Sequence, residues 1–154
     1  MAIPFTDREM ERAWRNNLSA YHNSPQIPRT NAHRLLLFYA VECGLKVILM
    51  KRKRKKRTDD CAEISECQHN INKLLDCLGA GGSLNLPEIF IQEISDTRNN
   101  KKPRKLNSGQ INQMWRYGGQ VVSIVTEPKK ATDKDIETRL VTILKWIERE
   151  IGKA

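Results

Sequence analysis

The chain has 154 residues, and 27 lysines and arginines against 18 aspartates and glutamates give it a formal net charge of +9. This length is enough for one domain with a core that needs no disulfides, so we expect a single domain over residues 1–154. The longest apolar stretch, residues 35–50, is broken by charged residues and does not fit a membrane span. The N-terminus has no apolar signal region and the chain has four cysteines, a pattern that predicts a cytoplasmic protein with free thiols.

The positive charge is concentrated in two clusters, and the rest of the chain has 15 cations against 18 acids. We therefore expect an ordinary globular body that carries basic loops at residues 51–58 and 98–109. The clusters consist of Lys51, Arg52, Lys53, Arg54, Lys55, Lys56 and Arg57, and of Arg98, Lys101, Lys102, Arg104 and Lys105. Like charges in a row repel one another, so the first cluster is predicted to be mobile.

The N-terminal third of the chain predicts two long helices. Thr6 and Glu9 have the spacing of a capping box, and apolar residues follow at helical intervals up to Tyr21. Asn31 can cap the second helix, which is apolar on almost every side as far as Met50. Such a helix belongs at the centre of a bundle.

The remaining segments are interpreted mainly as helices. A third helix opens at Asp59 or Asp60 and runs to the glycines at 79–82. Pro87 suits the first turn of a fourth helix that directs Ile89, Phe90 and Ile94 inward.

Ser108 is the expected cap of a short segment around Trp115, and residues 120–126 fit either a strand or a helix. The last helix begins after Thr132 and ends before Gly152. Five or six helices with little or no sheet predict an all-α, up-and-down helical bundle.

Three segments together resemble the HEPN (higher eukaryotes and prokaryotes nucleotide-binding) superfamily. Residues 32–46 are similar to its central apolar helix with an alanine, a glutamate and a Leu-Lys pair. Residues 69–74 resemble its His-x-Leu-x-x-Leu-like segment, and residues 115–117 its aromatic-Arg-Tyr segment. The resemblance implies a helical bundle, often a dimer, in prokaryotic toxin–antitoxin, abortive-infection or antiviral systems.

Many members of that family cleave RNA without a metal, using an arginine that is often followed by a polar residue, then four to six residues and a histidine. Here Arg98 and Asn99 begin that motif, but no histidine follows His69. The pattern is met only at Arg15 and His22, which lie almost two helical turns apart on one face. They are the candidate catalytic pair, although their place on the first helix differs from the family position.

The two basic clusters are the candidate nucleic-acid-binding residues, because lysine and arginine gain affinity by releasing counterions from phosphates. We expect a HEPN-like, non-catalytic component of a prokaryotic defence or toxin–antitoxin system. It would bind nucleic acid, with RNA favoured over DNA, or an acidic protein partner. A second copy, in a homodimer, or a subunit of a defence complex is the further partner that we expect, and no membrane is expected.

Two alternatives stay open: a metal-independent endoribonuclease that uses Arg15 and His22, and an accessory subunit that holds the DNA backbone. The cysteine spacings do not match the usual zinc sites, and there is no phosphate-binding glycine-rich loop. No metal and no cofactor are therefore expected.

Overall fold

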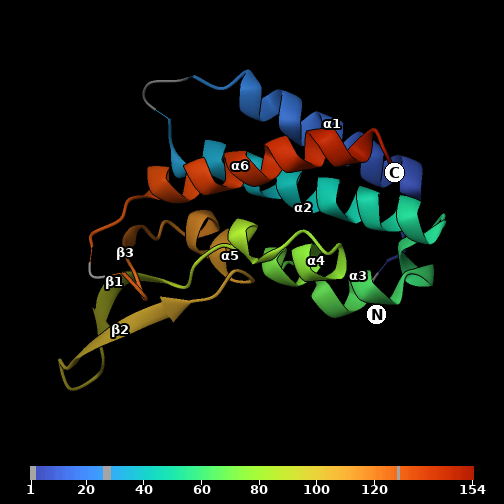
Figure 1. Cartoon of the computed structure of the whole chain (residues 1–154). Helices are drawn as coiled ribbons and strands as arrows, with labels where there is room; N and C mark the ends of the chain where they lie inside the picture. The colour runs from blue at the N-terminus through green and yellow to red at the C-terminus, as the bar shows by residue number, and fades with distance from the viewer. Residues whose placement is uncertain (1–2, 26–28, 128) are drawn as a thin grey trace.

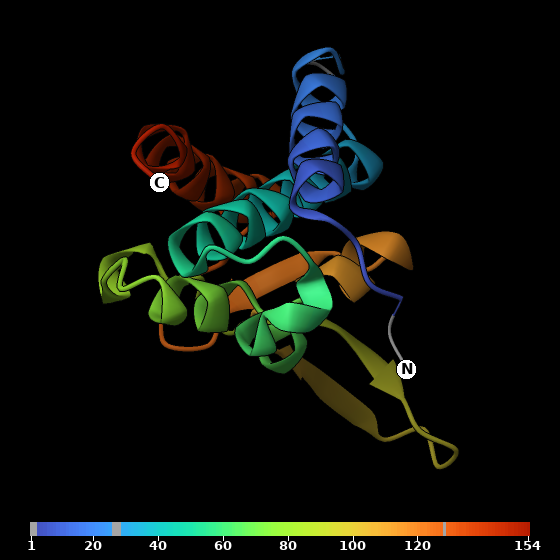
Figure 2. The same cartoon turned by 90° about the vertical axis from the view of Figure 1, so that its right-hand side faces the viewer.

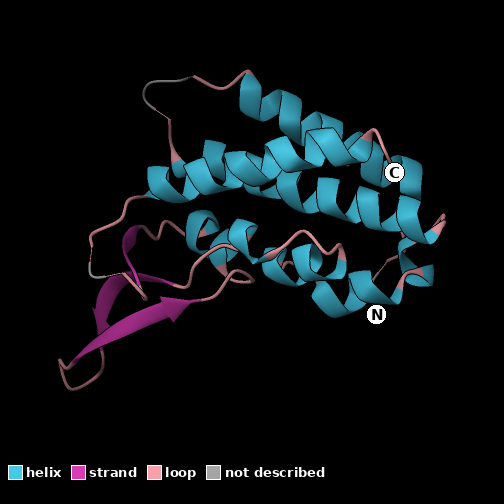
Figure 3. Cartoon of the chain, in the orientation of Figure 1, coloured by secondary structure: helices cyan, strands magenta, loops and turns pink. Residues whose placement is uncertain are grey.

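The computed structural model describes residues 3–25, 29–127 and 129–154, in which helices and a small sheet occupy separate regions (Figures 1 and 3). The helices are α1 (Asp7–His22), α2 (Asn31–Lys53), α3 (Ala62–Cys67), α4 (Ile71–Cys77), α5 (Ile111–Arg116) and α6 (Asp133–Ile151). The strands are β1 (Ile89–Ser95), β2 (Lys101–Leu106) and β3 (Val121–Ile124), and two short 3-10 turns are η1 (Thr58–Asp60) and η2 (Gly82–Leu84). No helix in these ranges is both long and apolar enough to cross a membrane.

Helix α2 lies at the centre of the helical region, as its apolar sequence predicted. Figure 2 shows α1 and α6 on one side of it and the shorter helices on the other. Twelve of its residues are buried, among them Phe38, Leu45 and Ile48. The apolar side chains of α2 therefore hold together the neighbours on both sides.

The two flanking helices come very close to α2 at Gly44. A Cβ atom at this position would lie only 2.7 Å from the Trp14 ring of α1 and 2.8 Å from Ile147 of α6. The predicted capping box of α1 is confirmed, because Thr6 pairs with Glu9, and the predicted start of α6 after Thr132 is confirmed, because Thr132 caps that helix and pairs with Asp135. Glycine at position 44 thus allows the three longest helices to pack without a gap.

The all-α prediction is wrong, because three antiparallel strands form a sheet in the order β2-β1-β3. Residues 89–95, which we expected in a fourth helix, pair with β2 from Ile89 opposite Leu106 to Ser95 opposite Lys101. The ambiguous stretch at 120–126 contains β3, which pairs with the other side of β1.

The error has a physical cause in the pattern of residues 89–95. Ile89 and Ile91 are buried, while Phe90 and Gln92, which follow them in turn, are half-buried. This is the two-residue alternation of a strand. Asp96 then closes a tight turn, because its side chain accepts hydrogen bonds from the backbone of Arg98 and Asn100. The partner strand is so polar that its own sequence gives no strand signal.

Three other predictions are corrected. The third helix is broken into α3 and α4, because Gln68 has a φ of 50° and Asn70 starts a new helix as its N-cap. The basic segments are also not loops throughout: residues 51–53 form the last turn of α2, and residues 101–106 form β2. Ser108 does not cap α5, which has Gln110 at its N-cap.

Candidate acid–base site and cationic surfaces

Glu42 is the centre of a small charged cluster on α2. It is only 6% exposed, and its Oε2 atom accepts a hydrogen bond from Nζ of Lys46, one turn further along the helix, at 2.8 Å. Its Oε1 atom lies 2.9 Å from Nδ1 of His69. A buried carboxylate thus has two cationic partners, one on α2 and one at the junction of α3 and α4.

The break between α3 and α4 puts His69 in this position. Gln68 ends α3 with a positive φ, and the Asn70 side chain accepts a hydrogen bond from the Lys73 backbone to begin α4. His69 lies between these two residues and is directed back toward α2. Its side chain remains 54% exposed, so it contacts both the buried carboxylate and the solvent.

The pKa values of the pair are shifted toward the charged forms. The hydrogen bond that His69 donates to Glu42 raises the pKa of His69 above its ordinary value of 6.5, against burial and the charges of Lys46 and Arg116. Burial works to raise the pKa of Glu42, but the hydrogen bonds and charges of His69 and Lys46 outweigh it and lower that pKa. Both partners are therefore stabilised in their ionised state.

This arrangement fixes which nitrogen of His69 can do chemistry. The Glu42 carboxylate accepts the proton on Nδ1, so Nε2 is the atom that can take or give a proton. Within the described residues, Nε2 has no hydrogen-bond partner. A carboxylate that orients a half-exposed imidazole is the usual arrangement of a general acid or base.

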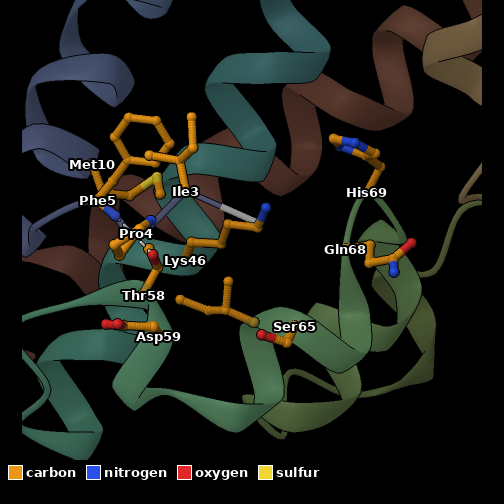
Figure 4. Close-up of a pocket in the computed structure, with 11 residues that line it drawn as sticks. Ile3, Pro4, Phe5, Met10, Lys46, Thr58, Asp59, Ser65, Gln68 and His69 are labelled. Atoms are coloured by element: carbon orange, nitrogen blue, oxygen red, sulfur yellow. Dashed lines mark hydrogen bonds between the residues drawn. The ribbon is translucent and has the colours of Figure 1, made fainter. Parts of the chain in front are cut away.

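A cavity of about 670 Å³ opens beside this pair. Figure 4 shows Ile3, Pro4, Phe5 and Met10 gathered at one end of it and Gln68 with His69 at the other, with Lys46 between them. The cavity thus has an apolar end and a cationic end.

Arg116 and the neighbouring tyrosines continue the cationic end toward the sheet. Arg116, the last residue of α5, donates a hydrogen bond to the Tyr39 hydroxyl at 2.6 Å. Its guanidinium lies 5.9 Å from the centre of the Tyr117 ring. Since its charge also acts on His69, one cationic region extends from Lys46 past His69 to Arg116.

Most cations of the segment at 51–57 are paired with acids. Arg52 contacts Glu150 at 3.1 Å, Lys53 contacts Glu63 at 3.3 Å and Arg57 contacts Asp59 at 2.7 Å. Lys51 and Lys56 each lie 3.7 Å from an acid of α1, Glu11 and Asp7 respectively. The paired cations of this segment therefore contact acids of α1, α3, α6 and the η1 turn, and its predicted mobility stays a prediction.

The cations of the β1–β2 hairpin (residues 89–106) are arranged differently. In the part of the chain that the structure describes, no acid forms an ion pair with Arg98, Lys101, Lys102 or Lys105, and all four are exposed. Arg104 is half-buried and donates to the Gln92 carbonyl at 2.8 Å, at the irregular step in the strand pairing. The hairpin has five cations and two acids, and β2 lies at the edge of the sheet.

The two basic segments lie far apart. Figure 1 shows the hairpin at one end of the molecule and the end of α2 at the other. The two basic segments therefore do not form one continuous basic surface.

Arg15 and His22 lie on α1, and both are exposed. Arg15 pairs with Glu11 at 3.1 Å and lines a shallow hollow with Arg8, Arg12 and Asn16, to which His22 does not contribute. The catalytic role of this pair remains a prediction, and the structure places fewer interacting groups around it than around His69.

The cysteines are free thiols. The Sγ atoms of Cys67 and Cys77 lie 3.6 Å apart, and burial with the Cys77 contact raises the pKa of Cys67 to about 12. At neutral pH such a thiol stays protonated and packs as a small apolar group.

Three separate segments contribute to this region: residues 32–46 supply Glu42 and Lys46, residues 69–74 supply His69, and residues 115–117 supply Arg116. Sequence reasoning did not single out this set. The spacing of Glu42 and Lys46, together with a histidine just before a helix-capping asparagine, is the signal that could have found it.

The comparisons with known proteins add no further evidence. No protein-family model, no curated protein and no solved structure matches the chain.

Proposed function

We propose that this chain is a HEPN-like component of a prokaryotic defence or toxin–antitoxin system that binds RNA through the β1–β2 hairpin. The hairpin replaces the segment at 51–57 as the main contact with the phosphate backbone. The proposal keeps the nucleic-acid partner expected from the sequence and changes the surface that carries it.

The proposal rests on the difference in ion pairing between the β1–β2 hairpin and the segment at 51–57. Lysines and arginines bind a phosphate backbone by releasing the counterions around it, which requires side chains that are not already held by acids. The exposed cations at 98, 101, 102 and 105 meet this condition within the described residues, whereas five of the seven at 51–57 do not.

Two features support RNA as the ligand and a HEPN-like role for the chain. The convergence of Glu42, Lys46, His69 and Arg116 gives the three resembling segments a common location. The cationic region past Arg116 then continues to the hairpin, since Tyr117 lines one hollow with Arg104 and Lys105. A strand held by the hairpin would therefore lead toward His69.

The test is the salt dependence of binding to a labelled 20-nucleotide RNA. Each phosphate contact on a single strand adds about 0.7 to the slope of log Kd against log salt, so Lys101→Ala/Lys102→Ala should lower the slope by about 1.4. The matched control Lys51→Ala/Lys53→Ala removes the same charge from two lysines that are paired with Glu11 and Glu63, and it should leave the slope almost unchanged. Wild type that does not bind, or that binds double-stranded DNA more tightly, would contradict the proposal.

A second function, metal-independent RNA cleavage, is favoured by the orientation of His69. Nε2 of His69 would take the proton of a ribose 2′-hydroxyl, and the 2′-oxygen would attack the phosphorus. The 5′-oxygen would leave with a proton from water, which gives a 2′,3′-cyclic phosphate and a 5′-hydroxyl. Lys46 and Arg116 would offset the charge on the phosphate.

A cleavage assay with chelator present distinguishes the two catalytic candidates. Loss of a general base slows a reaction by roughly 10²- to 10⁴-fold, so His69→Gln should abolish detectable cleavage while His22→Ala should not. The opposite result would restore Arg15 and His22 as the site. RNA binding without cleavage by wild type would leave only the first function.

A further inference from the structure

Tyr117 is the most exposed large apolar side chain among the described residues, with 76% of its surface open to solvent. Its backbone is nevertheless held firmly at the end of α5. The Tyr117 amide donates to the Gln113 carbonyl at 3.0 Å, and the Gly119 amide donates to the Met114 carbonyl at 2.8 Å. Gly118, with a φ of 81°, makes the tight turn between these bonds. The ring thus projects into solvent from a fixed base.

Polar and cationic groups surround this ring. Tyr117 lines a hollow of about 290 Å³ together with Arg104 and Lys105 of β2 and Gln110 and Gln113 of the α5 region. The Arg116 guanidinium also lies near the ring, 5.9 Å from its centre. Cations of two different elements, β2 and α5, therefore lie near one exposed aromatic ring.

We propose that Tyr117 stacks on an unpaired base of single-stranded RNA, with Arg104, Lys105 and Arg116 holding the phosphates on either side of that base. This inference rests on the proposed function and specifies the form of its ligand. Every base has a flat face, so the site accepts any sequence. In a duplex the faces are covered by neighbouring base pairs, and Tyr117 has no partner.

The charge around the ring supports a nucleic acid over a protein partner. An apolar protein surface would bury the ring but would leave Arg104, Lys105 and Arg116 without counter-charges. A nucleotide offers an aromatic face and a phosphate a few ångströms apart, which matches a ring flanked by guanidinium and ammonium groups.

The experiment measures Kd for a single-stranded RNA and for an RNA duplex with wild type, Tyr117→Ala and Tyr117→Phe. Loss of one stacked base should weaken single-strand binding by Tyr117→Ala about 5- to 100-fold. Phenylalanine keeps the ring and should stay within about twofold of wild type, and duplex binding should not change. The matched control is Val122→Ala, which truncates an apolar side chain that is 44% exposed on β3 and lines neither hollow, and it should have no effect.

The outcomes separate this inference from the proposed function. If wild type binds the single strand and Tyr117→Ala binds it equally well, stacking is wrong while RNA binding through the hairpin stands. An equal loss on single strand and duplex would also overturn stacking. If wild type binds neither RNA, the proposed function itself fails.

Discussion

The segment at 51–57 and the β1–β2 hairpin are both strongly basic, but the fold treats their charges differently. Five of the seven cations at 51–57 contact acids on α1, α3, α6 and the η1 turn, and Arg52 also donates to the Leu78 carbonyl at 2.8 Å. The exposed hairpin cations form no ion pair with a described residue.

The difference teaches that a run of lysines and arginines does not by itself mark a binding surface. Charges that are already paired stabilise the junctions between helices and have less to gain from a phosphate. Charges on a free edge strand remain available to a ligand. Lysines on an edge strand also discourage pairing with another chain, so the comparison has to be tested by binding as well as by stability.

The largest expected effect is on stability. Arg52→Ala removes the bonds to Leu78 and Glu150 and leaves a carbonyl without its partner, so the free energy of unfolding should fall by about 1–2 kcal/mol. Lys101→Ala should stay within about 0.5 kcal/mol of wild type, as expected for an exposed residue without partners. Urea unfolding measures both, and equal losses would remove the distinction between the two segments.

A smaller effect is expected when the acids at 51–57 are neutralised. Asp59→Asn/Glu63→Gln removes the acidic partners of Arg57 and Lys53. If those ion pairs keep the segment from binding phosphates, RNA should bind about threefold more tightly to this variant. Glu66→Gln/Glu148→Gln changes the total charge equally but frees neither cation. Equal Kd values for the two variants would mean that only the net charge matters.

The smallest effect concerns the pH dependence of the Glu42–His69 pair, which faces Lys46 and Arg116 as well. Because the pKa of His69 is raised, its contribution to stability is fully present below about pH 6.5 and is lost as the pH rises through the folded-state pKa. His69 is half-exposed, so the loss should stay below about 1 kcal/mol. Urea unfolding at pH 6 and pH 8 should show this loss in wild type and in Lys101→Ala but not in His69→Gln.

The helices that depend on local signals were predictable from the sequence. Thr6 and Thr132 each have a capping partner three residues further along the chain. The apolar character of α2 is visible in the residues around Leu45. β2 was not predictable, because it is stabilised by pairing with β1 while its own residues are almost all polar.

The candidate site was predictable only in part. Glu42 and Lys46 lie one turn apart within the segment that carries the resemblance, and the charges at 98–105 were identified as a cluster. The position of His69 depends on the break at Gln68, which has no strong sequence signal. The exposure of Tyr117 and the pairing of the cations at 51–57 are consequences of tertiary structure.

The most direct test of the central claim is a titration of ¹⁵N-labelled protein with a short single-stranded RNA, followed by NMR of the backbone amides. We expect the shift changes to concentrate at residues 98–106 and 116–119, with residues 51–57 almost unaffected. Changes concentrated at 51–57, with the hairpin unchanged, would contradict the account.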